Sequence, residues 1–206
     1  MAIETLGTEK VKLTRRPRGL HCVSMVAFLA IVSLGGCGQA QGIAGWSMDH
    51  VVSDVPVPEP VFDALDRASY VQDGSSRAPD IIYVFSDPNC PHCHALWHSL
   101  RPWVASGRVQ VRHILVGLIR ADSPQKSAAI FSSSDPSAAL AIVAGGGEVE
   151  LDPDLPLQAV SDNQALMERL GLNATPGMIL HLSGGATSAA IGTPGNDWLV
   201  SQLGKP

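Results

Sequence analysis

Hydrophobic and polar residues beyond position 60 follow periods that predict alternating strands and helices. The continuous apolar run Ile81–Phe85 is typical of a strand buried on both faces of a sheet. Arg108–Gly117 alternates and then becomes apolar, which predicts a second strand. Apolar residues recur at helical spacing from Cys90 to about Ser106, so we expect a helix between the two strands, with Pro102 kinking it or ending it early.

The rest of the chain adds helices and a hairpin. Two weak helices are predicted in the Ala- and Ser-rich segment 123–147, and the clearest helix has a polar start and a glycine stop over Ser161–Gly171. The other expected elements are a short amphipathic helix at Val61–Tyr70, a loop at Gln72–Pro79, hairpin strands at Met178–Leu182 and Ala186–Ile191, and a final helix at Asn196–Leu203.

The first 40 residues have the pattern of an export signal. A basic region, Lys10–Arg18, precedes the apolar run Cys22–Leu34, which is short beside the roughly 20 residues of a membrane span. A buried core helix and a membrane anchor are the alternatives. Leu34–Cys37 resembles a bacterial lipobox, which would make Cys37 a lipid anchor, while residues 38–40 equally resemble an ordinary cleavage site.

Residues 41–60 contain Gly, Ser and several prolines, and Ser53–Pro60 is incompatible with regular helix, so an extended tether is predicted. The expected organisation is therefore a signal peptide at 1–40, a tether at 41–60 and one domain at 61–206.

Charge excludes two classes of partner. The chain has 14 Lys and Arg against 19 Asp and Glu, and five of those bases lie in the first 40 residues. The exported part is therefore strongly acidic and has no electrostatic footprint for nucleic acid or an anionic membrane.

Cysteine positions point to a reactive site. Of the four cysteines, Cys22 and Cys37 fall in the signal, which leaves Cys90 and Cys93 in the domain. A disulfide between two cysteines this close in sequence cannot join distant parts of a domain, so the pair is interpreted as a reactive site.

Cys90 and Cys93 open the helix that follows the buried strand. The free N–H groups and the positive end of that helix favour the Cys90 thiolate, and a cationic His92 would add to this effect. Pro91 suits the first helical position. A stabilised thiolate makes the disulfide easier to reduce, so the pair is predicted to perform thiol–disulfide exchange.

Other readings of the same residues remain open. Cys90–His94 also matches the c-type haem attachment pattern, with Met167, Met178 or His181 as nominal distal ligand. A zinc site would need Cys90, Cys93, His94 and His98, whose spacing on one helix does not suit a tetrahedral metal. A purely structural disulfide is the third alternative. We expect neither a metal nor a cofactor.

Thr175–Pro176 lies between the clearest helix and the hairpin. A cis bond here would bring this backbone beside the cysteine pair, whereas an ordinary turn proline would be trans.

Five segments together resemble the DsbC/DsbG thiol–disulfide interchange family, over about residues 62–204. They are Val84–Cys93, Arg101–Val111, Leu115–Ile119, Ser161–Asn163 and Asn173–Pro176. The resemblance implies an α/β protein with a thioredoxin fold and a helical insertion at about 120–170. It also implies a periplasmic location, exported protein thiols and disulfides as substrates, and a membrane thiol reductase as partner.

By this resemblance Cys90 is the nucleophile, Cys93 resolves the mixed disulfide, and Thr175 and Pro176 contact substrate. An isomerase or reductase is expected. Pro91–His92 between the cysteines instead resembles the oxidase DsbA, which is the alternative within the class. Family members carry an amino-terminal dimerisation domain, for which the residues between the predicted signal and Val61 are too few, so a monomer is predicted.

Overall fold

The computed structural model describes residues 52–53 and 57–206. The predicted signal peptide, the lipidation candidate Cys37 and most of the predicted tether lie outside the described residues. Among the helices that are described, none is both long and apolar enough to cross a bilayer.

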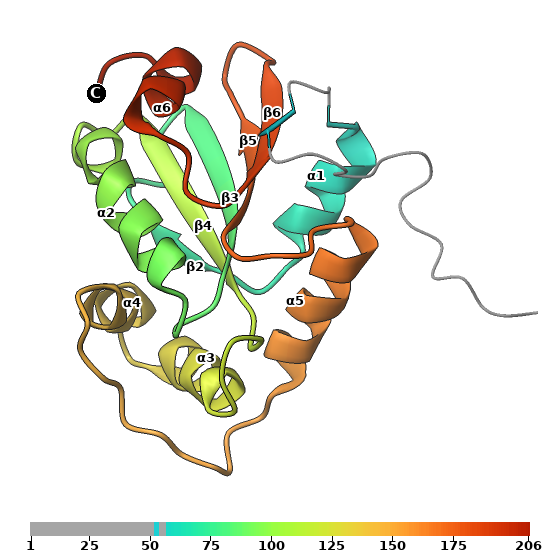
Figure 1. Ribbon diagram of the computed structural model, residues 1–206, viewed down its shortest axis with the longest axis vertical. Coiled ribbons are helices and arrows are strands. Elements are labelled where there is room, and N and C mark those ends of the chain that lie inside the picture. The colour runs from blue at the N-terminus through green and yellow to red at the C-terminus, as the bar shows by residue number, and fades with distance from the viewer. Residues whose placement is uncertain (1–51, 54–56) are drawn as a thin grey trace, which may run out of the picture. The chain divides into compact units, whose positions relative to one another are not determined.

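In the described part of the chain, the fold is built on a six-stranded sheet with strand order β1-β6-β5-β3-β4-β2 (Figure 1). The strands are β1 (Val52–Ser53), β2 (Val71–Asp73), β3 (Asp80–Ser86), β4 (Val109–Leu115), β5 (Gly177–His181) and β6 (Thr187–Ile191). β3 and β4 are parallel and joined by a helix, whereas every other neighbouring pair is antiparallel. A β-α-β unit is thus followed, after further helices, by the predicted hairpin.

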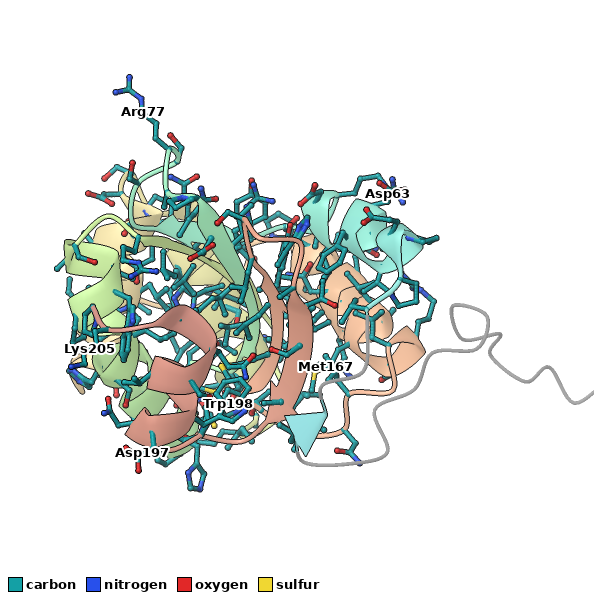
Figure 2. The ribbon with its side chains drawn as sticks, turned by 90° about the horizontal axis from the view of Figure 1, so that it is seen from above. Asp63, Arg77, Met167, Asp197, Trp198 and Lys205 are labelled. Carbon is teal, nitrogen blue, oxygen red and sulfur yellow. The ribbon has the colours of Figure 1, made fainter. Side chains whose placement is uncertain are left out.

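Within residues 57–206, six helices pack around this sheet: α1 (Glu59–Asp66), α2 (Pro91–Ala105), α3 (Ser123–Ser132), α4 (Pro136–Ala144), α5 (Gln158–Arg169) and α6 (Asn196–Leu203). α1 and α5 cover one face, and α2 and α6 cover the other. Figure 2 shows the layers from above, with Met167 of α5 turned toward the sheet and Asp63 of α1 turned away from it.

The central strand β3 connects two cores. Tyr83 and Phe85 pack with α1 and α5, while Ile82 and Val84 pack with α2 and α6. All four side chains are at most 1% exposed. The interpretation of the run Ile81–Phe85 as a strand buried on both faces is therefore confirmed.

The insertion predicted at about 120–170 contains helices of two kinds. α5 shares the core of α1 and the sheet through Leu166 and Met167, and Leu170, directly after the helix, joins them. α3 and α4 instead form a smaller core against the edge of the sheet, around Ile130 and Leu140.

The structure corrects the predicted loop at Gln72–Pro79. Its first two residues belong to the short strand β2, which pairs antiparallel with β4. Three residues with a polar centre and a polar end carry too little periodicity to be recognised. Asp73 is nevertheless buried there, because Arg101 forms an ion pair with its carboxylate and His113 Nε2 lies 3.6 Å from it.

Prolines lie within both α1 and α2, and the bounds of α1 differ from those predicted. α1 begins at Glu59 and ends at Asp66, rather than spanning 61–70. Pro60 is tolerated in its first turn, where no N–H is needed. α2 continues past Pro102 to Ala105. Trp103, which is 1% exposed, secures this last turn, and its Nε1 donates to the Gly204 carbonyl at 2.8 Å.

Asn163 of α5 provides a test of how the layers are joined. Its Nδ2 donates to the carbonyls of Ser69 (2.8 Å) and Leu115 (3.0 Å), and its Oδ1 accepts from Ser69 N–H (3.2 Å). Asn163→Ala leaves these buried groups unpaired, so we expect a loss of about 2–4 kcal/mol in the free energy of unfolding. Urea denaturation measures it, with the exposed Glu168→Ala as control. Equal stability of the two variants would contradict this assignment.

Candidate active site

Cys90 stands at the junction between β3 and α2. Its backbone is extended (φ −89°, ψ 111°), and Pro91 occupies the first turn of the helix, as predicted. The Cys90 carbonyl accepts the first helical N–H bonds, from Cys93 at 3.0 Å and His94 at 3.2 Å. Both cysteines are free thiols and buried, with exposures of 2% for Cys90 and 6% for Cys93.

Hydrogen bonds lower the pKa of Cys90 from 9.0 to about 5. The Cys93 thiol makes the largest contribution, and burial opposes it. The Thr175 side chain and the backbone N–H groups of Cys93 and His92 contribute further. These donors stabilise negative charge on Cys90 in the way that is typical of a cysteine at a helix amino terminus.

Cys93 behaves in the opposite way. Its pKa lies far above 9.0, chiefly because its proton is shared with Cys90 and because it is deeply buried. The backbone N–H of Asp87 partly offsets this effect. One thiol of the pair is therefore ionised at neutral pH while the other holds its proton.

The predicted proline loop lies beside the pair. The Thr175–Pro176 peptide bond is cis, and the Cys90 thiol donates to the Thr175 carbonyl at a sulfur–oxygen distance of 3.4 Å. Thr175 Oγ1 is buried. When both cysteines are protonated, it has no hydrogen-bond partner among the described residues. A Cys90 thiolate is an acceptor for that hydroxyl, in accord with its effect on the pKa of Cys90.

His92 is exposed, and its backbone makes the contacts that reach the site. Its N–H is among the donors that lower the pKa of Cys90. Its carbonyl accepts from Thr193 Oγ1 at 3.0 Å, which ties the loop after β6 to the start of α2.

Asp87 is a site residue that the sequence patterns did not single out. Its buried carboxylate accepts from the backbone N–H groups of Asn89 (2.8 Å), Leu118 (2.5 Å) and Ile119 (2.9 Å) and from the Ser123 hydroxyl (2.8 Å). Its carbonyl accepts the Cys90 N–H at 3.0 Å. Its position between a strand and the cysteines was a signal, since an aspartate there caps a turn.

Asn89 extends this network to α3. Its Nδ2 donates to Asp122 Oδ1 (3.0 Å) and Ser123 Oγ (2.9 Å), and Lys126 Nζ donates to its Oδ1 (3.0 Å). Lys126 also pairs with Glu148 at 2.7 Å. α3 thus holds the turn that presents Cys90.

The loop after β4 approaches α3 closely at Gly117. A Cβ atom at this position would lie 2.7 Å from the backbone of Pro124. The absence of a side chain therefore lets the next two N–H groups reach Asp87.

The ligands that haem or zinc would need are engaged elsewhere. His94 Nε2 lies 2.8 Å from the Pro88 carbonyl, and Met167 and Met178 pack in the cores on opposite faces of the sheet. His181 stacks on Phe62 with ring centroids 4.2 Å apart. Within residues 52–53 and 57–206, no three His, Cys, Asp or Glu side chains converge as metal ligands.

Two curated proteins are similar to this chain in sequence. No family model matches the chain. It is 38% identical over 155 residues to the thiol:disulfide interchange protein DsbG of Pseudomonas aeruginosa, and 37% identical over 145 residues to DsbG of Escherichia coli. The alignments cover 72% and 68% of this chain but only 60% and 58% of those two proteins.

Solved structures confirm the predicted fold. The catalytic domain of Proteus mirabilis ScsC is 20% identical with a TM-score of 0.55, over 70% of this chain and 93% of that domain. A periplasmic thioredoxin-like protein from Salmonella enterica serovar Typhimurium is 17% identical with a TM-score of 0.54, over 71% and 95%. The chain is an α/β protein with a thioredoxin-like fold.

The asymmetry of the thiols predicts how Cys90 titrates. We expect the thiolate absorbance of Cys90 to appear with a midpoint near pH 5 in the reduced protein. Cys93→Ala removes the largest donor and should raise that midpoint by roughly one to two pH units. Cys93→Ser keeps a hydroxyl donor and serves as control. Equal midpoints in the Ala and Ser variants would show that the Cys93 donor is unimportant.

The contacts of Asp87 predict a stability effect near the site. Asp87→Ala leaves three backbone N–H groups and the Ser123 hydroxyl without their acceptor, so we expect a loss of about 3 kcal/mol or more in the free energy of unfolding. The exposed Asp63→Ala of α1 is the control in the same urea titration. An effect no larger than that of the control would mean that water replaces the carboxylate.

Proposed function

We propose that this chain, a DsbG-like protein in sequence and thioredoxin-like in fold, exchanges disulfides with exported proteins through Cys90 and Cys93. The observation that carries the proposal is the opposite ionisation of two thiols in one turn of helix. Cys90 is held as thiolate near neutral pH, whereas Cys93 keeps its proton.

The reaction proceeds in two exchanges. The Cys90 thiolate attacks one sulfur of a substrate disulfide, the Cys90–substrate bond forms, and the other substrate sulfur leaves as thiolate. Cys93 then loses its proton and attacks Cys90 Sγ, which releases the second substrate sulfur as thiolate. The substrate disulfide has gained two electrons, and the Cys90–Cys93 disulfide has formed. The reverse sequence oxidises a substrate dithiol.

Isomerisation uses the first exchange alone. If another thiol of the substrate attacks the mixed disulfide before Cys93 does, Cys90 is released and the substrate disulfide has moved. A slow second exchange favours this outcome, and the firmly held proton of Cys93 supports it.

Thr175 and Pro176 are proposed to contact substrate. The support is their place directly beside Cys90, whose sulfur lies 3.4 Å from the Thr175 carbonyl oxygen. A substrate joined to Cys90 through its sulfur therefore lies next to the same loop.

A DsbA-like oxidase is the second candidate, favoured by the low pKa of Cys90. Because that pKa is depressed to about 5, the thiolate stabilises the reduced protein at neutral pH, and this contribution disappears as pH falls through 5. Stabilising the reduced form makes the disulfide a stronger oxidant.

Further features of the proposal come from the sequence. We place the protein in the periplasm, reduced by a membrane thiol reductase, as a monomer, with Cys37 as a lipid anchor. Light scattering measures the assembly, and mass spectrometry of the exported amino terminus detects the lipid.

Substrate trapping and redox equilibrium test the proposal together. Cys93→Ser should accumulate a mixed disulfide with a scrambled disulfide substrate, and Cys90→Ser should accumulate none. Equilibration with glutathione should give a potential above the value of about −270 mV for thioredoxin. Trapping by Cys93 rather than Cys90 would reverse the assigned roles, and a potential below that of thioredoxin would exclude the oxidase.

A further inference from the structure

We propose that His113 accepts the proton of Cys93, through a water held in the cavity that both residues line, as Cys93 attacks the mixed disulfide. The inference rests on the proposed function of the cysteine pair. It assigns a part in that reaction to a buried histidine of β4 that lies outside the cysteine motif.

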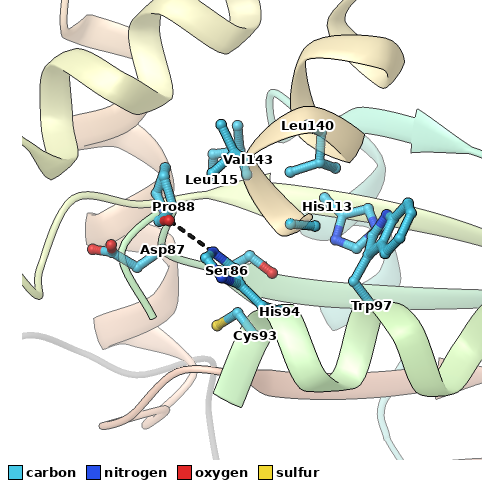
Figure 3. Close-up of a pocket in the computed structure, with 11 residues that line it drawn as sticks. Ser86, Asp87, Pro88, Cys93, His94, Trp97, His113, Leu115, Leu140 and Val143 are labelled. Atoms are coloured by element: carbon cyan, nitrogen blue, oxygen red, sulfur yellow. Dashed lines mark hydrogen bonds between the residues drawn. The ribbon is translucent and has the colours of Figure 1, made fainter. Parts of the chain in front are cut away.

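The cavity lies between the start of α2, the carboxyl ends of β3 and β4, and α4 (Figure 3). Cys93, Trp97 and His113 line it together with Ser86. The volume open to the centre of a water molecule is about 10 Å³. One water needs roughly 10–15 Å³ by this measure, so the cavity has room for about one. Thiol, hydroxyl and imidazole groups supply the polar partners that such a water needs.

His113 is the least satisfied polar side chain of this region. It is 3% exposed, and neither ring nitrogen has a hydrogen-bond partner among the described residues. Nε2 lies 3.6 Å from Asp73 Oδ2, which is too long for a hydrogen bond but close enough for electrostatic attraction. A buried polar group left unpaired is costly, so an ordered water or a function in the reaction is expected at such a site.

Asp73 determines which nitrogen is free. Burial opposes its ionisation, but its contacts with His113 and Arg101 dominate and lower the pKa of Asp73 to about 2, so it is an ionised acceptor. A carboxylate near Nε2 favours a proton on that nitrogen, which leaves the lone pair of Nδ1 unprotonated. His113 therefore has one nitrogen able to take a proton.

The surroundings keep the imidazole neutral at rest. Burial is the main cause that lowers the pKa of His113; Arg101 adds to it, while Asp73 opposes it. The titratable and charged groups around the ring are Asp73 of β2, Cys93, His94 and Arg101 of α2, and Asp87 of the loop between β3 and α2. α4 contributes only apolar side chains, Leu140, Val143 and Ala144.

The proton transfer from Cys93 to His113 and the disulfide exchange need no added reactant. The cavity water takes the proton of Cys93 Sγ and gives one of its own to His113 Nδ1, which becomes imidazolium beside the Asp73 carboxylate. Cys93 Sγ bonds to Cys90 Sγ, and the substrate sulfur leaves with the electron pair of the broken bond. His113 later returns its proton to solvent or to the departed thiolate.

Stopped-flow reaction of the reduced protein with dithiobis-nitrobenzoate separates the two exchanges. Attack by Cys90 releases one coloured thiolate, and attack by Cys93 releases a second. We expect His113→Gln to leave the first phase unchanged and to slow the second at least 10-fold, toward the low end of general-base contributions of about 10²–10⁴. The control is His98→Gln, an exposed histidine of α2 that contacts the Ala144 carbonyl, and both phases should stay as in the wild type.

The outcomes separate this inference from the proposed function. Release of only one equivalent by the wild type would overturn the exchange reaction itself. Release of two equivalents, with an unchanged second phase in His113→Gln, would overturn the assignment of His113 alone. Equal slowing of both phases would also overturn it, because a merely structural residue has that effect.

The pH profile of the wild type tests the inference even if the variant fails to fold. With His113 as proton acceptor, the second phase rises with pH until His113 is neutral and is then constant. Without it, the rate rises with slope one until Cys93 itself ionises, in the alkaline range. A continuous rise through neutral pH would contradict the inference.

Discussion

The backbone N–H groups at the start of α2 lie close to the Cys90 sulfur and stabilise negative charge on it. Everything distinctive about the site depends on this interaction. Because Pro91 supplies no donor, the N–H groups of His92 and Cys93 become the backbone partners of Cys90. The same turn brings the two sulfurs together, so one proton is shared unequally between two thiols. Ionisation of Cys90 and protonation of Cys93 are thus two aspects of one arrangement.

Holding that arrangement requires rigidity on every side. β3 is packed on both faces and fixes where Cys90 begins, while Asn89 and Asp87 bind the intervening turn to α3 and to the loop after β4. Thr193 holds the other side of the helix start through the His92 carbonyl. α3 and α4 accordingly buttress the reactive turn, with a small core of their own against the sheet edge.

The elements that could be predicted from the sequence are those whose structure depends on a few adjacent residues. The buried run of β3, the proline at the start of α2, and the hairpin around Gly184–Gly185 each depend on a few adjacent residues. The strand β2 was not predicted, because the burial of its Asp73 depends on an ion pair with Arg101, which is distant in sequence.

The supporting residues around the cysteines were harder to recognise. Asp87 gave only a turn signal and His113 gave none, and their significance appears only when β3, β4 and α2 are assembled around one cavity. The sequence argument assigned the effect of His92 to a cationic ring, and that stays a prediction. The structure adds a second contribution from this residue, because its backbone N–H also lowers the pKa of Cys90.

Gly117 shows how packing around the site limits which residue a position can hold. The position has no functional group, yet a single methyl group there would collide with Pro124 and pull two N–H donors away from Asp87. A saturation mutagenesis scan scored by activity would therefore rank this glycine beside the cysteines. Its intolerance to substitution would reflect the space it leaves empty rather than any chemistry it performs.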